Sequence, residues 1–170
     1  YISAFLKIHG GEFVANEVSK ARADLIAQVV HHGTVTNFDG RKIPSELGNF
    51  DRILLDAPCT GIGALRRRPE VRWRRTLQDL KNLTVLQAEL LDSAEGSLRS
   101  GGILAYVTCS SHQAETTFQI RSFLRRHPHF RIKPIDDPRV DSDGNLQLWT
   151  HRDGCDSMFI SLLMKVGAEE

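Results

Sequence analysis

The sequence predicts an α/β fold built on a mostly parallel sheet. Short apolar runs alternate with longer segments whose apolar residues recur at helical spacing. Turn residues separate the two kinds of segment, and no internal repeat or low-complexity tract interrupts them. Alternation of this kind is typical of a single sheet with helices on both faces.

The expected elements follow in order along the chain. A short strand at 13–15 ends at Asn16-Glu17, and Ser19 caps a helix that continues to about residue 31. A weak strand at 35–38 ends at Asp39-Gly40, and a strong apolar strand spans 52–57. These three strands and one helix lie in the first third of the chain.

The second half of the chain continues the alternation. Leucines at helical spacing predict a long amphipathic helix at 77–98, which Ser100-Gly101-Gly102 would stop. The next strand is expected at 103–108, and a helix at 114–126 would end at His127-Pro128. Two late strands are expected at 130–135 and 158–165, with a polar, turn-rich loop between them.

Length and composition indicate one globular domain over residues 1–170. The chain is 41% hydrophobic and 25% charged, which is typical of a folded soluble protein. No apolar run approaches the roughly 20 residues that span a bilayer, so no membrane partner is expected. Residues 1–7 resemble the interior of a helix and lack an initiator Met, so we expect the domain to be incomplete at its N-terminus.

The three cysteines lie at 59, 109 and 155. An odd number at long spacing is a poor disulfide framework, and it lacks the close pairs of a zinc site. A reducing, cytoplasmic compartment is therefore expected, and no metal.

Polar and reactive residues follow several of the predicted strands. They are Glu17, Asp39, Asp56 with Cys59, and Cys109. Ligands of open α/β sheets bind beyond the carboxyl ends of the strands, so these side chains would gather along one rim. Glu17 would suit ribose hydroxyls, although a solvated loop acid is the more common use of such a residue. Asp39 equally suits an ordinary turn. Asp56 directly follows a buried type of strand, where an unpaired charge is costly, which favours a functional role.

The two cysteines at strand ends have several possible uses. A lone Cys is most often an inert small apolar residue. A metal site would need further ligands, and His112 gives no standard spacing with Cys109. A redox pair is possible but is not of the CxxC type. Nucleophilic catalysis would need a thiolate, which a positively charged rim or a neighbouring base can supply.

The segment FDRILLDAPCTGIGALRRRPEVRW, followed by YVTCSS, resembles the RNA cytosine-5 methyltransferases of the RsmB (Sun/Fmu) type, relatives of the Nop2/NSUN enzymes. The resemblance runs from about Gly10 to Val166. It rests on DAPC and TCS at the ends of two strands, and the second cysteine distinguishes RNA from DNA cytosine methyltransferases. It implies a Rossmann-like class I methyltransferase sheet with an antiparallel last strand, and S-adenosylmethionine as cofactor.

The resemblance also implies roles for individual residues. Cys109 would add to carbon 6 of cytosine, and Cys59 would help to remove the carbon-5 proton and release the product. Asp56 would lie between cofactor and base and assist activation of the ring. Glu17 would hold the cofactor ribose, and Asp39 the adenine amino group.

A basic segment follows the first cysteine motif. Residues 65–75 contain six arginines and one glutamate, a local charge of +5 in a chain of net charge +1. Arginines bind phosphates through two parallel hydrogen bonds, and a Trp face can stack on a splayed base. The predicted RNA contacts are Arg66, Arg67, Arg68, Arg72 and Trp73. The alternative is a solvated basic face in which Trp73 is a packing anchor. Gly61 and Gly63 would give the loop room to approach a base.

The sequence departs from the family pattern in two places. The family's first strand and its Gly-rich cofactor loop would precede this chain, and the segment from Arg22 to Asp39 looks short for a helix, turn and strand. We therefore expect the carboxyl-side part of a larger enzyme, inactive by itself, with an N-terminal RNA-binding region elsewhere. The partner implied is RNA, with small-subunit ribosomal RNA suggested. Two alternatives are a methyltransferase acting on a non-RNA substrate and a non-catalytic RNA-binding module on the same scaffold.

Overall fold

The structure is a computed structural model that describes residues 10–167. It consists of two compact units, Tyr1–Leu47 and Gly48–Glu170, each of which is described by itself. The helical segment expected at residues 1–7 lies outside the described residues. The prediction of one domain over residues 1–170 stays a prediction.

The first unit contains a small parallel sheet and one helix. Strand β1 (Val14–Asn16) pairs with β2 (Thr34–Thr36), and helix α2 (Lys20–Val29) connects them. The segment that looked short accommodates all three parts because β2 has only three residues and a tight turn precedes it. Gly33 in that turn has φ +120°, and a Cβ there would lie 2.4 Å from the Phe13 carbonyl oxygen.

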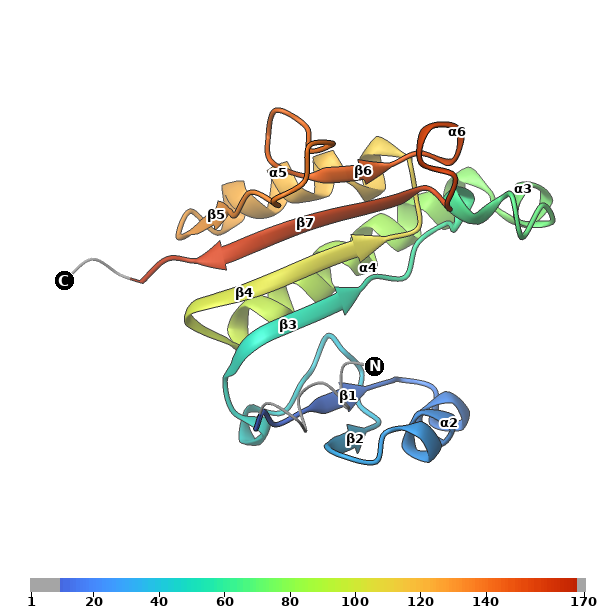
Figure 1. Ribbon diagram of the computed structural model, residues 1–170. Helices are drawn as coiled ribbons and strands as arrows, with labels where there is room; N and C mark the ends of the chain where they lie inside the picture. Colours follow the sequence, from blue (N-terminus) through green and yellow to red (C-terminus); the bar gives the residue numbers. More distant parts are fainter. Residues whose placement is uncertain (1–9, 168–170) are drawn as a thin grey trace. The chain divides into compact units, whose positions relative to one another are not determined.

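The second unit is a five-stranded sheet with two long helices (Figure 1). Its strands are β3 (Phe50–Asp56), β4 (Leu98–Thr108), β5 (Phe130–Ile132), β6 (Leu146–Leu148) and β7 (Met158–Lys165). Its helices are α3 (Val71–Arg74), α4 (Leu77–Gly96), α5 (Thr117–Arg126) and α6 (Thr150–Asp153). The strand order is β3-β4-β7-β5, and β6 also pairs with β7.

The strand directions confirm the predicted fold class. β3 and β4 are parallel, whereas β7 runs antiparallel to β4, β5 and β6. The last strand is therefore the one strand of this sheet that runs against the others. Within the described residues, the edge of β3 opposite β4 pairs with no strand.

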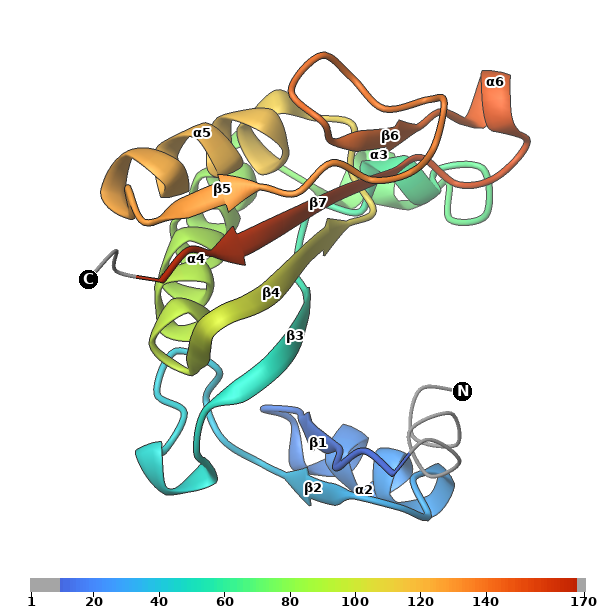
Figure 2. The ribbon, with the colours of Figure 1, turned by 60° about the vertical axis from the view of Figure 1, so that its left-hand side comes forward.

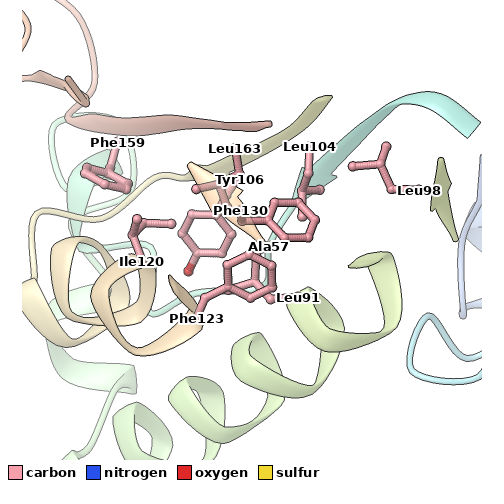
Figure 3. Close-up of a cluster of buried hydrophobic side chains, with 10 residues drawn as sticks. All are labelled: Ala57, Leu91, Leu98, Leu104, Tyr106, Ile120, Phe123, Phe130, Phe159 and Leu163. Atoms are coloured by element: carbon pink, nitrogen blue, oxygen red, sulfur yellow. The ribbon is translucent and has the colours of Figure 1, made fainter. Parts of the chain in front are cut away.

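Helices α4 and α5 pack on the same face of this sheet (Figure 2). Alternate residues of β4 and β7 point toward them, which is the two-residue period of a strand. Figure 3 shows the resulting core, in which aromatic and aliphatic side chains from both helices and three strands meet. The cluster consists of Ala57, Leu91, Leu98, Leu104, Tyr106, Ile120, Phe123, Phe130, Phe159 and Leu163.

The junction between helix α4 and strand β4 differs from the sequence prediction. Helix α4 ends at Gly96, and Ser100-Gly101-Gly102 lies inside β4 rather than stopping the helix. The pairing of β3 with β4 shifts between Phe50 and Arg52, so the glycines lie in an irregular part of the strand. Gly101 has φ +74°, a value that suits such an irregularity and that glycine adopts easily.

The loop expected between the last two strands contains further structure. It holds β6 and α6, which the sequence pattern does not predict because each has only three or four residues. The helix expected at 114–126 begins at Thr117, after a 3₁₀ turn at Gln113–Glu115. Among the described helices, none combines the length and apolar character needed to cross a membrane.

Candidate active site

The carboxyl ends of β3 and β4 bring the two cysteine motifs together. The strands are adjacent and parallel, with Asp56 opposite Val107, so both chains leave the sheet at the same edge. The Ala57 amide then donates to the Val107 carbonyl (2.9 Å), which extends the pairing by one residue. Cys59 and Cys109 follow within three residues of these positions.

The thiols of Cys59 and Cys109 are in contact. Their Sγ atoms lie 3.3 Å apart, within hydrogen-bond distance for sulfur, and both residues are half-buried free cysteines. Residues that are 50 positions apart in the sequence thus form one two-thiol site. Cys155 is also free and half-buried.

The contact separates the acidities of the two thiols. The hydrogen bond from Cys59 stabilises the Cys109 thiolate and lowers the pKa of Cys109 from 9.0 to about 7, although burial and the charges of Asp56 and Glu115 oppose this. The same hydrogen bond, together with burial and the charge on Cys109, raises the pKa of Cys59 well above its usual range. At neutral pH a substantial fraction of the pair therefore consists of a Cys109 thiolate and a Cys59 thiol that donates to it.

The loop after Cys59 is fixed to the backbone of Cys109. The Gly63 amide donates to the Cys109 carbonyl (3.0 Å), and the Ser157 amide donates to the Gly63 carbonyl (2.9 Å). A Cβ on Gly63 would lie 2.1 Å from the Ser157 carbonyl oxygen. Close approach of the protein's own backbone thus accounts for Gly63. Gly61 has φ +76°, with open space around a would-be Cβ, so its backbone conformation accounts for it.

A buried carboxylate that the sequence does not indicate contacts the residues that follow the two cysteines. Glu115 is fully buried and accepts hydrogen bonds from Thr60, Gln87 and Ser110. Thr60 and Ser110 are the residues directly after the two cysteines. The sequence carried no signal for this role, because Glu115 lies in a polar stretch that resembles a solvated helix start.

Asp56 is the last residue of β3, and it is exposed at the same edge of the sheet. Its charge raises the pKa of Cys109, which means that the carboxylate lies near enough to interact with that thiolate. This position is compatible with the role expected for Asp56 beside a bound base.

Glu17 and Asp39 lie in the first unit, beyond the carboxyl ends of its two paired strands. Glu17 follows β1, and its Oε1 accepts from the Ser19 amide and from Arg22, both at 2.8 Å. Asp39 follows β2 by three residues, and hydrogen bonds from Arg41 lower its pKa to about 2. Of the five residues expected along one rim, two therefore belong to the first unit, namely Glu17 and Asp39. The other three, Asp56, Cys59 and Cys109, belong to the second unit.

The predicted RNA-binding arginines divide into two groups. Arg67 donates twice to Asp156 and lowers its pKa, and Arg66 lies 3.7 Å from the same carboxylate. These two side chains tie the basic segment to the loop before β7. The side chains of Arg68 and Arg72 are exposed.

Trp73 is 77% exposed, so the alternative use as a packing anchor does not describe it. The Arg72 guanidinium lies 5.9 Å from the centre of its ring. Nearby, the Arg75 side chain donates to the Thr60 carbonyl (3.1 Å), which joins the basic segment to the loop that carries Cys59. Arg75 is thus the residue of the basic segment that contacts the loop after Cys59.

A group of possible metal ligands lies elsewhere in the second unit. Ligand atoms of Glu95, His127 and His129 lie within 4.8 Å of one another. The Lys165 ammonium, however, lies 2.9 Å from the Glu95 carboxylate, and it also donates to two backbone carbonyls. Since a positive charge already pairs with that carboxylate, the cluster is best described as a salt-bridge network.

Comparison with known proteins places this fold in a class. The family model described as 16S rRNA methyltransferase RsmB/F matches residues 1–164. A crystal structure of NSun6 from Pyrococcus horikoshii with SFG, an analogue of S-adenosylmethionine, superposes with a TM-score of 0.80 at 28% identity. It covers 93% of this chain and 42% of that one. The fold is that of the Rossmann-like methyltransferases.

Curated relatives define the family more closely. A putative methyltransferase of Mycobacterium tuberculosis (strain CDC 1551 / Oshkosh) is 46% identical over 159 residues, which cover 89% of this chain and 35% of the relative. Ribosomal RNA small subunit methyltransferase B of Serratia proteamaculans (strain 568) is 37% identical over 137 residues, covering 79% and 31%. The chain belongs to the RsmB/F family of rRNA methyltransferases, and it spans about a third of the length of these relatives.

Proposed function

We propose that the protein to which this chain belongs methylates carbon 5 of a cytosine in small-subunit ribosomal RNA, in the cytoplasm, through a covalent Cys109 adduct. Membership of the RsmB/F family supports methylation of rRNA. The contact between the Cys59 and Cys109 thiols is the observation that carries the finer proposal, because adduct chemistry needs one thiolate to attack and a second group to end the reaction.

Cys109 is the better attacking group of the two. Its lowered pKa makes a substantial fraction thiolate at neutral pH, and it remains half-exposed. The thiolate adds to carbon 6 of the cytosine ring, and the electron pair of the carbon 5–carbon 6 double bond moves toward carbon 5. Asp56, at the end of β3, would hydrogen-bond the cytosine ring and assist its activation.

Cys59 gains its role when Cys109 reacts. The main cause of its raised pKa is the hydrogen bond to Cys109, and the Cys109 charge adds to it. Once the Cys109 sulfur bonds to carbon 6, it becomes a neutral thioether, so both causes weaken and the pKa of Cys59 falls. Cys59 can then lose its own proton to solvent. The resulting thiolate accepts the carbon-5 proton, and the electrons of that C–H bond re-form the double bond as the Cys109 thiolate leaves.

S-adenosylmethionine, when bound, supplies the methyl group to carbon 5. The acidic residues of the first unit suit its nucleoside part, because carboxylates after adjacent parallel strands accept hydrogen bonds from hydroxyl and amino groups. The Ser19 amide and the Arg22 side chain both donate to Glu17 Oε1, and in this proposal the same carboxylate also receives the ribose hydroxyls. Asp39 would receive the adenine amino group.

The basic segment would hold the RNA. Exposed Arg68 and Arg72 suit phosphates, and exposed Trp73 suits a base that has left its stack. Arg66 and Arg67 would contribute through the charge of the segment, since Asp156 already engages them. The target cytosine must leave its stack to reach the thiols.

The test is bisulfite mapping of 5-methylcytosine in cellular RNA, with and without the intact gene. The proposal predicts that deletion removes the modification at one cytosine of small-subunit rRNA, and that a wild-type copy restores it. A Cys109→Ala copy should not restore it. An unchanged methylation map would refute the proposal.

A second experiment tests the roles of the two thiols. Cys59→Ala in the complete gene product should accumulate a protein–RNA adduct that survives denaturing electrophoresis, because the adduct forms but is not released. The double variant Cys59→Ala/Cys109→Ala should form none, and Cys155→Ala should behave as wild type. An adduct that persists in the double variant would exclude Cys109 as the attacking group.

The same experiments distinguish the two alternatives. A methyltransferase with a non-RNA substrate would keep its activity when Cys109 is replaced by Ala. A non-catalytic RNA-binding module would bind RNA yet show no heat of binding on titration with S-adenosylmethionine.

A further inference from the structure

Glu115 connects the two loops that carry the cysteines. It lies in the 3₁₀ turn before α5 and is fully buried. Its Oε1 accepts from the Thr60 amide (2.8 Å), and its Oε2 accepts from the Thr60 hydroxyl (2.5 Å) and the Ser110 hydroxyl (2.7 Å). One carboxylate thus holds the residue after Cys59 and the residue after Cys109.

The surroundings of Glu115 make this connection rigid. Gln87 of α4 donates to Glu115 Oε1 (3.2 Å) and to the Pro58 carbonyl (2.9 Å), so the loop is held on both sides of Cys59. The buried Tyr106 hydroxyl donates to the Glu115 backbone carbonyl (2.8 Å). A buried carboxylate with this many donors has little freedom to move, and hydrogen bonds to a charged group are stronger than neutral ones.

The charge of Glu115 does not help to form the thiolate. A negative charge near the pair raises the pKa of both cysteines, which opposes ionisation of Cys109. A residue that favoured the thiolate by electrostatics would be positive. The contribution of Glu115 must therefore be sought in the geometry of the two loops.

We propose that Glu115 is a positioning residue that holds the Cys59 and Cys109 thiols in contact through Thr60 and Ser110. It does not touch the base. The purpose of the contact rests on the proposed function, whereas the contact itself can be tested without RNA or cofactor.

The test is the pH dependence of Cys109 alkylation by iodoacetamide, followed peptide by peptide by mass spectrometry. Glu115→Gln removes the charge but keeps an acceptor for the Thr60 amide, and the two hydroxyls can rotate to accept from the new amide. In this variant the pH at which Cys109 alkylation reaches half its maximal rate should stay near 7 or fall. Glu115→Ala removes both the charge and the connection, so the midpoint should rise by more than one pH unit, with about a tenfold slower reaction at pH 7.

Glu115→Gln and Glu115→Ala both lose the same charge. Comparing them therefore separates the effect of the lost hydrogen bonds from the effect of the lost charge. A midpoint in Glu115→Ala that stays at or below that of Glu115→Gln would overturn the proposal. Because Glu115→Ala leaves several buried donors unpaired and is expected to be unstable, Thr60→Val/Ser110→Ala offers a milder variant that removes only hydroxyls. It should shift the midpoint upward as well, and an unchanged midpoint would count against the proposal.

Thr108→Val is the matched control. Thr108 precedes Cys109, is fully buried, and its hydroxyl has no hydrogen-bond partner among the described residues. Its removal should leave the Cys109 midpoint unchanged, and a shift as large as that of the milder variant would refute a specific role for Glu115. If the midpoints move as expected while rRNA methylation proves independent of the gene, the positioning role stands and the proposed function fails.

Discussion

At the residue scale, the two cysteines differ because of their surroundings. The same hydrogen bond lowers the pKa of Cys109 and raises that of Cys59. The attacking and releasing roles proposed for them thus depend on which sulfur donates. A single contact between the side chains of two loops that are far apart in the sequence thus sets the difference in pKa between the two thiols.

The first prediction concerns the acidity of Cys109. In wild type the rate of Cys109 alkylation should rise with pH and reach half its maximum near pH 7, since thiolate accumulates above the pKa. Cys59→Ala removes the donor, so the midpoint should move up toward 9.0, the ordinary thiol value. Alkylation rates measured from pH 5 to 10 check this, with Cys155→Ala as the control. An unshifted midpoint in Cys59→Ala would show that another group stabilises the thiolate.

At the scale of elements, parallel pairing of β3 and β4 brings the cysteine motifs together. The loop after β3 is then fixed at Gly63, which bonds to the backbone of Cys109 and to that of Ser157. Three segments that are far apart in the sequence therefore meet at one glycine. The side of this loop toward β7 has no room for a methyl group.

The second prediction follows from that close approach. Gly63→Ala should destabilise the protein by about 3 kcal/mol or more, because the new Cβ would overlap backbone rather than a side chain that can move. Gly96→Ala is the control, since a Cβ at the end of α4 meets no atom within 4 Å and alanine favours helix. Urea unfolding measures both variants, and equal midpoints would contradict the prediction.

At the scale of the whole molecule, positive charge is concentrated in one segment although the net charge is small. The net charge is only +1, yet residues 65–75 carry +5. Asp156 pairs with Arg66 and Arg67, so part of this charge stabilises the fold. The remaining exposed arginines, which include Arg68 and Arg72, are those that a nucleic acid would contact.

The third prediction concerns that remainder. Arg68→Gln/Arg72→Gln should weaken binding of single-stranded RNA and reduce the slope of log affinity against log salt by about 1.4, which corresponds to two lost phosphate contacts. Fluorescence anisotropy of a labelled cytidine-containing RNA, titrated at several salt concentrations, measures this. Arg121→Gln/Arg125→Gln on α5 removes the same charge and should leave the slope unchanged. Equal effects of the two variants would indicate binding by net charge alone.

Most of the fold could be predicted from sequence. The run at 158–165 matches β7, and the leucine spacing after Thr76 matches most of α4, because strong periodicity reflects burial on one face. Element ends were less predictable. Ser100-Gly101-Gly102 looked like a helix stop, but pairing with β3 made it part of β4, since glycine permits both.

The candidate site divides in the same way. The sequence by itself determined that the thiols of Cys59 and Cys109 follow strands, and those motifs carry the family resemblance. Only the tertiary structure decided that the two sulfurs lie 3.3 Å apart and that the buried Glu115 carboxylate bonds to Thr60 and Ser110. The physical reason is that strand periodicity is local, whereas a thiol's acidity and a carboxylate's burial depend on residues brought together from distant parts of the chain.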